Sequence, residues 1–340
     1  MPPEPMSAAP AQTLTDRVTG LAFDEHVLHA GFLGEAPFFV MADGAIQIGR
    51  EKPAVRPHAD SILVVASDGK RIVTGGDDGR IVETHPDGST IVLGDEKGRW
   101  IDAVALGPDG AVAWSTGRKV VAREGGKGKN SGKTRELVLP STSQGLAFAP
   151  KGYRLAIAHI DGASLWFPNT DTPPDVYGWK GPHIDITFSP DNRFLVTSMQ
   201  ENQLHGWKLA DKGHMRMSGY PGKTRSFSWS HDGLWLATSG AQAAIVWPFA
   251  KDGPTGKAPR ECGVRPAKVT KVAFHPQSLV LAIGYEDGWV MLVRFTDGAE
   301  LLVRAGGDGT PITALGWDGP GKRLVFGSES GASGLLALPV

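Results

Sequence analysis

TFSPDNRFLVTSMQENQLHGWK, residues 187–208, places an apolar run between two signals for tight turns. Ser-Pro-Asp-Asn marks the first turn and Glu-Asn the second, and the LVTSM segment between them shows no helical spacing. Asparagine and glycine suit such turns because they tolerate a positive φ or bond to their own backbone. A short apolar run bounded by turn residues is typical of a strand buried on both faces. The stretch therefore predicts a β-hairpin.

The same pattern recurs along the chain. Related first turns read VALGPDG (104–110), AFAPKG (147–152), SWSHDG (228–233) and AFHPQS (273–278), and successive first turns lie 35 to 45 residues apart. In six units a second turn follows ten residues later. A nearly constant period of this length indicates a repeat architecture with one hairpin of fixed size in each unit. The first-turn residues are Gly34, Gly69, Gly110, Gly152, Asn192, Gly233, Ser278 and Gly321, and the second-turn residues are Gly44, Gly79, Gly162, Asn202, Gly288 and Gly331.

The units also share a strand that ends in tryptophan, at Trp166, Trp207 and Trp247. A Ser-Pro-Asp-Gly-like turn, a Leu-Ala-Thr-Gly-like strand, an Asp-Gly turn and this tryptophan together resemble WD40 repeats, from about residue 17 to the C-terminus. The resemblance implies an all-β fold, a closed β-propeller of four-stranded antiparallel blades. It also implies one propeller domain over residues 17–340, which we expect to follow a disordered leader over residues 1–16.

Two features depart from the family pattern. None of the three tryptophans is followed by aspartate, and the Gly-His pair that opens a typical unit is missing, with His58 and His183 alone near that position. We therefore expect the family's His–Ser/Thr–Asp–Trp hydrogen-bond network to be incomplete in most blades.

We expect eight blades, with seven as the alternative because the first unit is short. The last unit supplies only three strands, whereas Arg17–Phe23 precedes the first inner strand and has no blade of its own. Pairing these two ends removes exposed strand edges, so we expect the N-terminal strand to close the last blade. The predicted inner strands are 28–33, 61–66, 102–107, 144–149, 183–188, 224–229, 269–274 and 311–317.

The composition limits the class of protein. The formal net charge is −1, and a single cysteine, Cys262, excludes an intrachain disulfide framework. No apolar run approaches the roughly 20 residues that span a bilayer, and no secretory signal precedes the repeats. We therefore expect a cytoplasmic protein that is monomeric by itself, does not bind membranes and has no general affinity for nucleic acid.

Motifs that carry chemistry are weak. GGKGKNSGKT (125–134) resembles a phosphate-binding loop, but Lys127 stands where the first glycine of that motif is needed and no helix follows. We interpret it as a mobile solvated loop. The alternative is contact with nucleic acid or an acidic partner through Lys127, Lys129, Lys133 and Arg135. We expect no catalytic residue, no cofactor and no metal site, and hence a protein that is not an enzyme.

The resemblance implies a scaffold that presents loops to one or more proteins in a larger complex. In a propeller, the second turns and the connections from each outer strand to the next inner strand gather on one face, here called the upper face. The alternative is a propeller enzyme or small-ligand binder that uses the axial channel. Aromatic and arginine side chains are enriched at binding hot spots. The predicted partner-binding residues of the upper face are Arg56, His58, Arg99, Trp100, Arg118, His159, Trp179, His183, Tyr220, Arg225, Lys268 and Tyr285.

Overall fold

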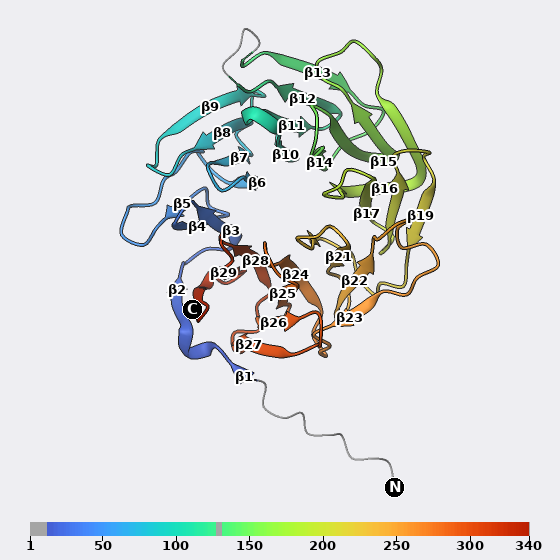
Figure 1. The fold of residues 1–340 in the computed structure, drawn as a ribbon. Helices are drawn as coiled ribbons and strands as arrows, with labels where there is room; N and C mark the ends of the chain where they lie inside the picture. The colour runs from blue at the N-terminus through green and yellow to red at the C-terminus, as the bar shows by residue number, and fades with distance from the viewer. Residues whose placement is uncertain (1–11, 127–130, 340) are drawn as a thin grey trace.

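The computed structural model describes residues 12–126 and 131–339. Within these ranges the regular structure is almost entirely β-strand, and the two helices are single 3-10 turns, η1 (Thr15–Arg17) and η2 (Pro108–Gly110). No helix in the described ranges is long and apolar enough to cross a membrane. The strands surround a central axis like the blades of a propeller (Figure 1). The predicted all-β propeller is therefore confirmed.

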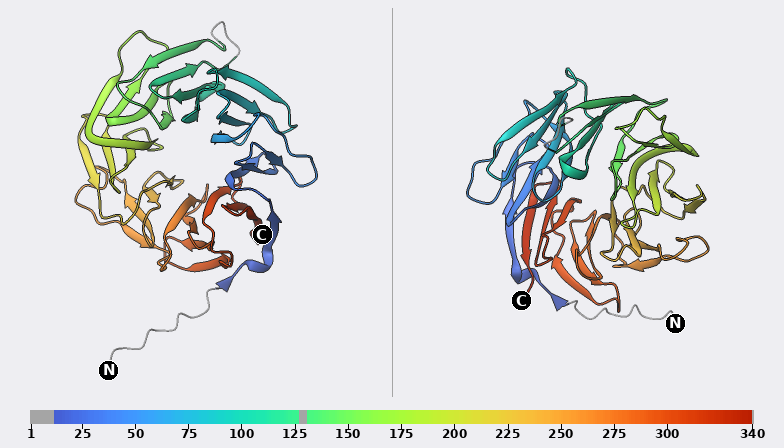
Figure 2. Two further views of the ribbon diagram at one scale, coloured as in Figure 1. Left: turned by 180° about the vertical axis from the view of Figure 1, so that it is seen from behind. Right: turned by 45° about the horizontal axis from the view of Figure 1, so that its top comes forward.

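The N-terminal half of the chain contributes fifteen strands. They run around the ring in chain order, and each group of strands extends from the axis to the rim (Figures 1 and 2). These strands are β1 (Gln12–Thr13), β2 (Val18–Ala22), β3 (Val27–Leu33), β4 (Ala36–Met41), β5 (Ile46–Ile48), β6 (Ile62–Ser67), β7 (Ile72–Gly76), β8 (Arg80–Thr84), β9 (Thr90–Asp95), β10 (Ala103–Leu106), β11 (Val112–Thr116), β12 (Lys119–Arg123), β13 (Thr134–Val138), β14 (Gly145–Phe148) and β15 (Leu155–Trp166).

The C-terminal half continues the same arrangement and brings the chain back to its starting point. Its strands are β16 (Asp175–Phe188), β17 (Phe194–Met199), β18 (Leu204–Lys208), β19 (His214–Met217), β20 (Phe227–Trp229), β21 (Trp235–Thr238), β22 (Ala244–Pro248), β23 (Arg260–Cys262), β24 (Val269–Phe274), β25 (Val280–Tyr285), β26 (Val290–Arg294), β27 (Glu300–Arg304), β28 (Ile312–Trp317), β29 (Arg323–Ser328) and β30 (Ala332–Ala337).

The described strands form seven hydrogen-bonded sheets. In the sheets β6–β9, β10–β13 and β20–β23, each strand pairs with the next in the chain, and the pairing is antiparallel. The first sheet is an exception to the predicted four strands. It contains β3, β4 and β5, and an isolated bridge between Ile46 and Val55 stands in place of a fourth strand.

One sheet has six strands because β16 takes part in two repeats. The first half of β16 pairs with β15, whereas His183–Phe188 pairs with β17. Asp161 and Gly162 have positive φ in the middle of β15, where the second turn was predicted. The inner strands of all eight repeats are therefore present at the predicted places. The separate sheets number seven, the alternative that the sequence leaves open, because this six-stranded sheet holds two repeats.

The two ends of the described chain meet in one sheet. Strand β2 pairs antiparallel with β30 over Val18–Ala22, so an N-terminal strand supplies the outer edge of the last blade, as predicted. The hydroxyl of Thr313 in β28 also donates to the carbonyl of Val27 in β3, 2.5 Å away. At the end of the predicted leader, β1 pairs in parallel with β27, and η1 follows it. Residues 1–11 of that leader lie outside the described residues.

The core lies between neighbouring sheets, because both faces of the blades are apolar. Every residue of β7, β11 and β17 is buried. Trp247 on β22 is 7% exposed and packs in one cluster with Phe194 and Val196 of the preceding sheet. It thus lies between two adjacent blades.

Removal of residues 1–25 should destabilise the whole propeller, because it deletes β2 and exposes the edge of β30 together with the apolar groups beneath it. We expect a cooperative decrease of the melting temperature, measured by circular dichroism. A melting temperature equal to that of the intact chain would contradict the role of β2.

Trp247→Ala should decrease the free energy of unfolding by about 3–5 kcal/mol, because it leaves a large cavity between two sheets. Trp247→Phe keeps most of the apolar volume and should cost less. Urea-induced unfolding of the three proteins measures both effects, and a loss below about 1 kcal/mol for Trp247→Ala would show that this indole is not a wedge between blades.

Candidate functional site

Six of the twelve predicted partner-binding residues are exposed side chains. They lie near the second turns or in the connections that enter the inner strands, which places them on the upper face. The guanidinium of Arg56 forms an ion pair with the carboxylate of Asp43 at 2.6 Å, so this arginine is already partnered within the chain. The exposed members are Arg56, Arg99, Trp100, Arg118, Arg225 and Lys268.

Five other predicted residues, His58, His159, His183, Tyr220 and Tyr285, are buried. The ring of His58 lies with Nδ1 3.0 Å from a carboxylate oxygen of Asp78 and Nε2 2.8 Å from the hydroxyl of Thr74. Burial opposes ionisation of Asp78, but hydrogen bonds from the amide of Arg80 and from His58 lower the pKa of Asp78 to about 2. His58 therefore anchors a loop and offers no surface to a partner.

Tyr220 has a similar position in a later repeat. Its hydroxyl lies 2.7 Å from the hydroxyl of Thr238 and accepts a hydrogen bond from the indole of Trp247 at 2.7 Å. In the repeat before it, Nδ1 of His183 lies 2.7 Å from the hydroxyl of Thr197. A phenol and an imidazole thus serve the same purpose in neighbouring repeats, which is to tie a loop of the upper face to the second strand of its blade.

His159 and Tyr285 are also bound internally. Nε2 of His159 lies 2.9 Å from the hydroxyl of Ser164, and the hydroxyl of Tyr285 donates to the carbonyl of Gly263 at 2.5 Å. Burial raises the pKa of Tyr285 above its usual value. The structure therefore places these two residues under the loops of the upper face.

The twelfth predicted residue, Trp179, is half-buried in a stack of rings. Its indole lies 4.0 Å from the imidazole of His205 at an interplanar angle of 14°. The imidazole of His214 lies 5.5 Å from His205 and completes the stack. Neither ring nitrogen of His205 has a hydrogen-bond partner among the described residues. Burial first, and then the nearby His183 and His214, lower the pKa of His205 to about 3.

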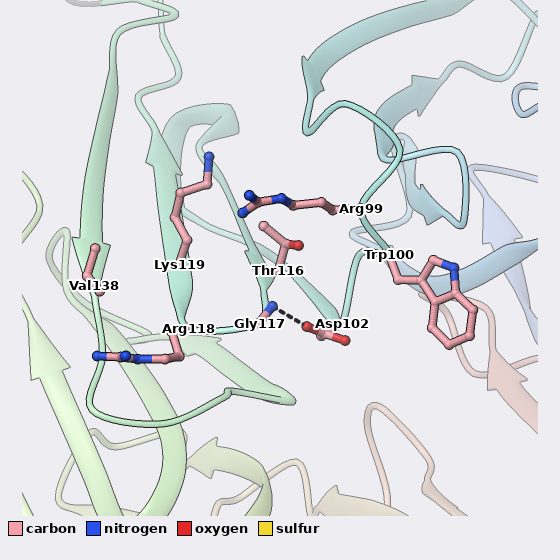
Figure 3. A pocket seen from close by; sticks show the side chains of 8 residues that line it. All are labelled: Arg99, Trp100, Asp102, Thr116, Gly117, Arg118, Lys119 and Val138. Carbon is pink, nitrogen blue, oxygen red and sulfur yellow. Dashed lines mark hydrogen bonds between the residues drawn. The ribbon is translucent and has the colours of Figure 1, made fainter.

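Arg99, Trp100 and Arg118 come together at one hollow of about 680 Å³, here called the Arg99 hollow. It lies between the sheets β6–β9 and β10–β13. Trp100 is 68% exposed, and Val138 at the outer edge of the same hollow is also 68% exposed. Figure 3 shows the side chain of Arg99 pointing toward Lys119, whereas the indole of Trp100 projects to the other side of its loop.

Three cationic side chains, Arg99, Arg118 and Lys119, line the Arg99 hollow together with one carboxylate, Asp102. Lys119 pairs with the carboxylate of Glu96. No described carboxylate pairs with Arg99 or Arg118, and Arg118 donates through Nε to the carbonyl of Leu139 at 2.8 Å. Two guanidinium groups therefore line this hollow, and neither is neutralised by an ion pair with the described part of the chain, while the exposed Trp100 lies at the loop that carries Arg99.

Arg225 and Lys268 come together at a second hollow of about 320 Å³, here called the Arg225 hollow. It lies between the sheets β20–β23 and β24–β27. These sheets stand across the ring from β6–β9 and β10–β13 (Figure 1). Lys223 and Glu286 also line the Arg225 hollow. Sequence reasoning missed Lys119, Lys223 and Val138, although Lys119 directly follows the predicted Arg118 and Lys223 lies two residues before the predicted Arg225.

The opposite face of the ring has a hollow of about 630 Å³ with mixed charge. Glu35 at its rim pairs with Arg323, and Asp68 pairs with Arg71, so its carboxylates are neutralised by arginines. Lys70 also lines this hollow. Arg99, Arg118 and Arg225, which form no ion pair with a described residue, lie at the two hollows of the upper face, and these hollows together form the candidate site.

The Lys- and Gly-rich stretch over residues 125–134 lies between two strands, and no helix follows it, as predicted. It connects β12 to β13, which pair with one another. Lys127 and Lys129 lie outside the described residues, and Arg135 pairs with Asp171 at 2.9 Å. Across the described part of the chain, no group of three or more His, Cys, Asp or Glu side chains is arranged to hold a metal ion.

Comparison with known proteins supports the fold alone. No family model matches the chain, and no curated protein matches its sequence. Among solved structures, the chain is similar to a crystal structure of the computationally designed Ika8 protein, with a TM-score of 0.75 and 16% sequence identity. That match covers 93% of this chain and 98% of the Ika8 chain. The similarity extends over nearly the whole propeller.

The stacked His205 predicts how stability depends on pH. Its folded-state pKa lies below that of a free histidine, so the unfolded chain takes up a proton first as the pH decreases. The contribution of His205 to the free energy of unfolding is therefore complete above about pH 6.5 and decreases below that pH. Between pH 7 and pH 5 we expect this residue to cost about 2 kcal/mol of folding free energy.

His205→Phe should reduce this acid sensitivity, because the ring stays in the stack and no longer titrates. The exposed His231 gives a matched control, since His231→Gln should keep the wild-type slope. Unfolding in urea at pH 5, 6 and 7 measures the three slopes. Equal slopes for the wild type and His205→Phe would refute this assignment.

Proposed function

We propose that this chain is a non-catalytic WD40-type interaction protein whose upper face binds one or more protein partners. The observation that carries the proposal is the exposed Trp100, at 68% exposure, beside Arg99 and Arg118 in one hollow. Tryptophan and arginine bury much surface on binding, and arginine donates several hydrogen bonds, so both are enriched among hot spots. The blades beneath hold these side chains on a rigid base.

The WD40 assignment rests on the repeat pattern and on buried contacts. The contacts of His58 with Thr74 and Asp78 reproduce three members of the family's His–Ser/Thr–Asp–Trp network. Tyr220 replaces the histidine where Trp247 completes the network. These substitutions explain why the sequence motif is weak while the loops stay anchored.

We further propose that the protein acts in the cytoplasm as one member of a larger complex and is monomeric by itself. A balanced net charge of −1 and a single cysteine, Cys262, which is buried and unpaired, are consistent with a reducing compartment. The partner is bound through loops, so the described framework of strands stays unchanged on binding.

The double variant Trp100→Ala with Arg225→Ala should lose partner binding, because it removes one anchor from each hollow. Partners recovered with the wild-type protein from cell extract are purified and titrated against both proteins. We expect binding to be at least ten-fold weaker, which corresponds to about 1.4 kcal/mol or more.

Lys151→Ala with Lys322→Ala is the matched control, because both lysines are exposed at first turns, on the opposite face. The control should bind like the wild type, and all three proteins should have similar melting temperatures. If the double variant binds the same partners with unchanged affinity, the upper face is not the docking surface.

A further inference from the structure

The Arg225 hollow has a composition that suits one kind of ligand. Three cationic side chains, Lys223, Arg225 and Lys268, line it together with a single carboxylate, Glu286. None of the three cations forms an ion pair with a described residue, and the amide nitrogen of Lys268 donates to the carboxylate of Glu286 at 2.9 Å. The carboxylate therefore binds backbone, and the hollow keeps an excess of positive charge.

Backbone packing fixes these cations relative to one another. Gly240 has a φ of +103°, and a Cβ atom at this position would lie 2.9 Å from the carbonyl oxygens of both Gly222 and Lys223. The amide of Gly240 also donates to the carbonyl of Val269 at 3.1 Å. Three separate segments thus meet at Gly240, and this close backbone packing sets the spacing of the segments that carry Lys223, Arg225 and Lys268.

Polar groups beneath the hollow support anion binding. The hydroxyl oxygen of Ser239 accepts a hydrogen bond from the amide of Arg225 at 3.1 Å, and its proton has no acceptor among the described residues. Lys271 on β24 lies within electrostatic range of Arg225. Burial lowers the pKa of Lys271, Asp185 opposes this change, and Arg225 adds to it. Lys271 does not itself line the hollow and lies near Asp185, so the excess of positive charge at the hollow comes from Lys223, Arg225 and Lys268.

We propose that the Arg225 hollow receives an acidic side chain of the protein partner, so that the partner presents an Asp- or Glu-rich segment to the upper face. This proposal rests on the proposed function. A carboxylate accepts hydrogen bonds from a guanidinium and two ammonium groups, and it fits a volume of about 320 Å³.

The size and spacing of the charges favour a peptide over a nucleic acid. A single strand of nucleic acid needs a continuous basic groove with aromatic rings on which the bases stack. Here the cations form two hollows on different sides of the ring, and the Arg225 hollow contains no aromatic side chain. A peptide with separated acidic residues matches this arrangement.

The test uses the full-length protein and two pools of 12-residue peptides. One pool contains Asp and Glu at random positions, and the other contains Asn and Gln at the same positions. Binding is measured by fluorescence anisotropy at a fixed ionic strength. We expect the acidic pool to bind at least ten-fold more tightly than the amide pool. Equal binding of the two pools would overturn the proposal.

A triple variant, Lys223→Gln with Arg225→Gln and Lys268→Gln, locates the site. It should lose at least ten-fold in affinity for the acidic pool, while Lys151→Gln with Lys322→Gln should bind like the wild type. Equal losses in both variants would show a general charge effect and overturn the proposal. A single-stranded 12-nucleotide DNA that binds more tightly than the acidic pool would also overturn it, in favour of nucleic acid.

The partner recovered with the wild-type protein separates this inference from the proposed function. If Trp100→Ala weakens binding of that partner and the triple variant does not, the upper face remains the proposed docking surface. The proposed binding of an acidic side chain in the Arg225 hollow is then refuted. If the partner binds both variants like the wild type, the proposed function fails as well. Weaker binding in both variants supports the two proposals together.

Discussion

Each blade of this protein is apolar on both faces, and only another blade can cover such a face. This constraint explains the arrangement of the whole chain. The middle strands are buried from end to end, and clusters of apolar side chains such as that of Trp247 join one sheet to the next. The first and last repeats face the same requirement, and β2 meets it by pairing with β30. The framework therefore leaves loops as the surface that can vary.

The loops of the upper face are held by polar contacts that point inward. His58, His183 and Tyr220 each bond to a threonine of the second strand, and these buried groups fix where each loop begins. Because these groups are committed to the interior, the exposed side chains beside them carry any recognition. In this way the anchored loops of the upper face present Trp100 and Arg225 in defined places.

Much of this fold could be predicted from turn residues alone. Positive φ angles at Gly69, Asn192 and Gly233 confirm the first turns, and the inner strands follow from their spacing. The number of sheets could not be predicted. The outer strand of one repeat and the inner strand of the next form the single strand β16, which joins two repeats into one sheet, and no local sequence signal marks this. The parallel pairing of β1 with β27 joins residues far apart in the chain and has no local signal.

The sequence indicated which face of the ring carries the candidate site, but it did not show which side chains of that face are exposed. Connections between repeats had to gather on one face, and Arg99 and Lys268 are exposed in such connections. Burial of His58 and Tyr285 depends on tertiary hydrogen bonds, and a polar residue in a loop looks the same in sequence whether it is an anchor or a contact. Both hollows combine segments of different repeats, so Lys119 and Lys223 became visible only once the blades were assembled.

The exposure of Trp100 has an optical consequence. The chain contains ten tryptophans, and the other nine are half-buried or buried. A water-soluble quencher such as iodide therefore reaches the Trp100 indole most readily, and the red edge of the emission spectrum reports mainly on this one ring. The protein thus carries an intrinsic fluorophore on the face where we place its partner, and occupancy there can be followed by light without an attached dye.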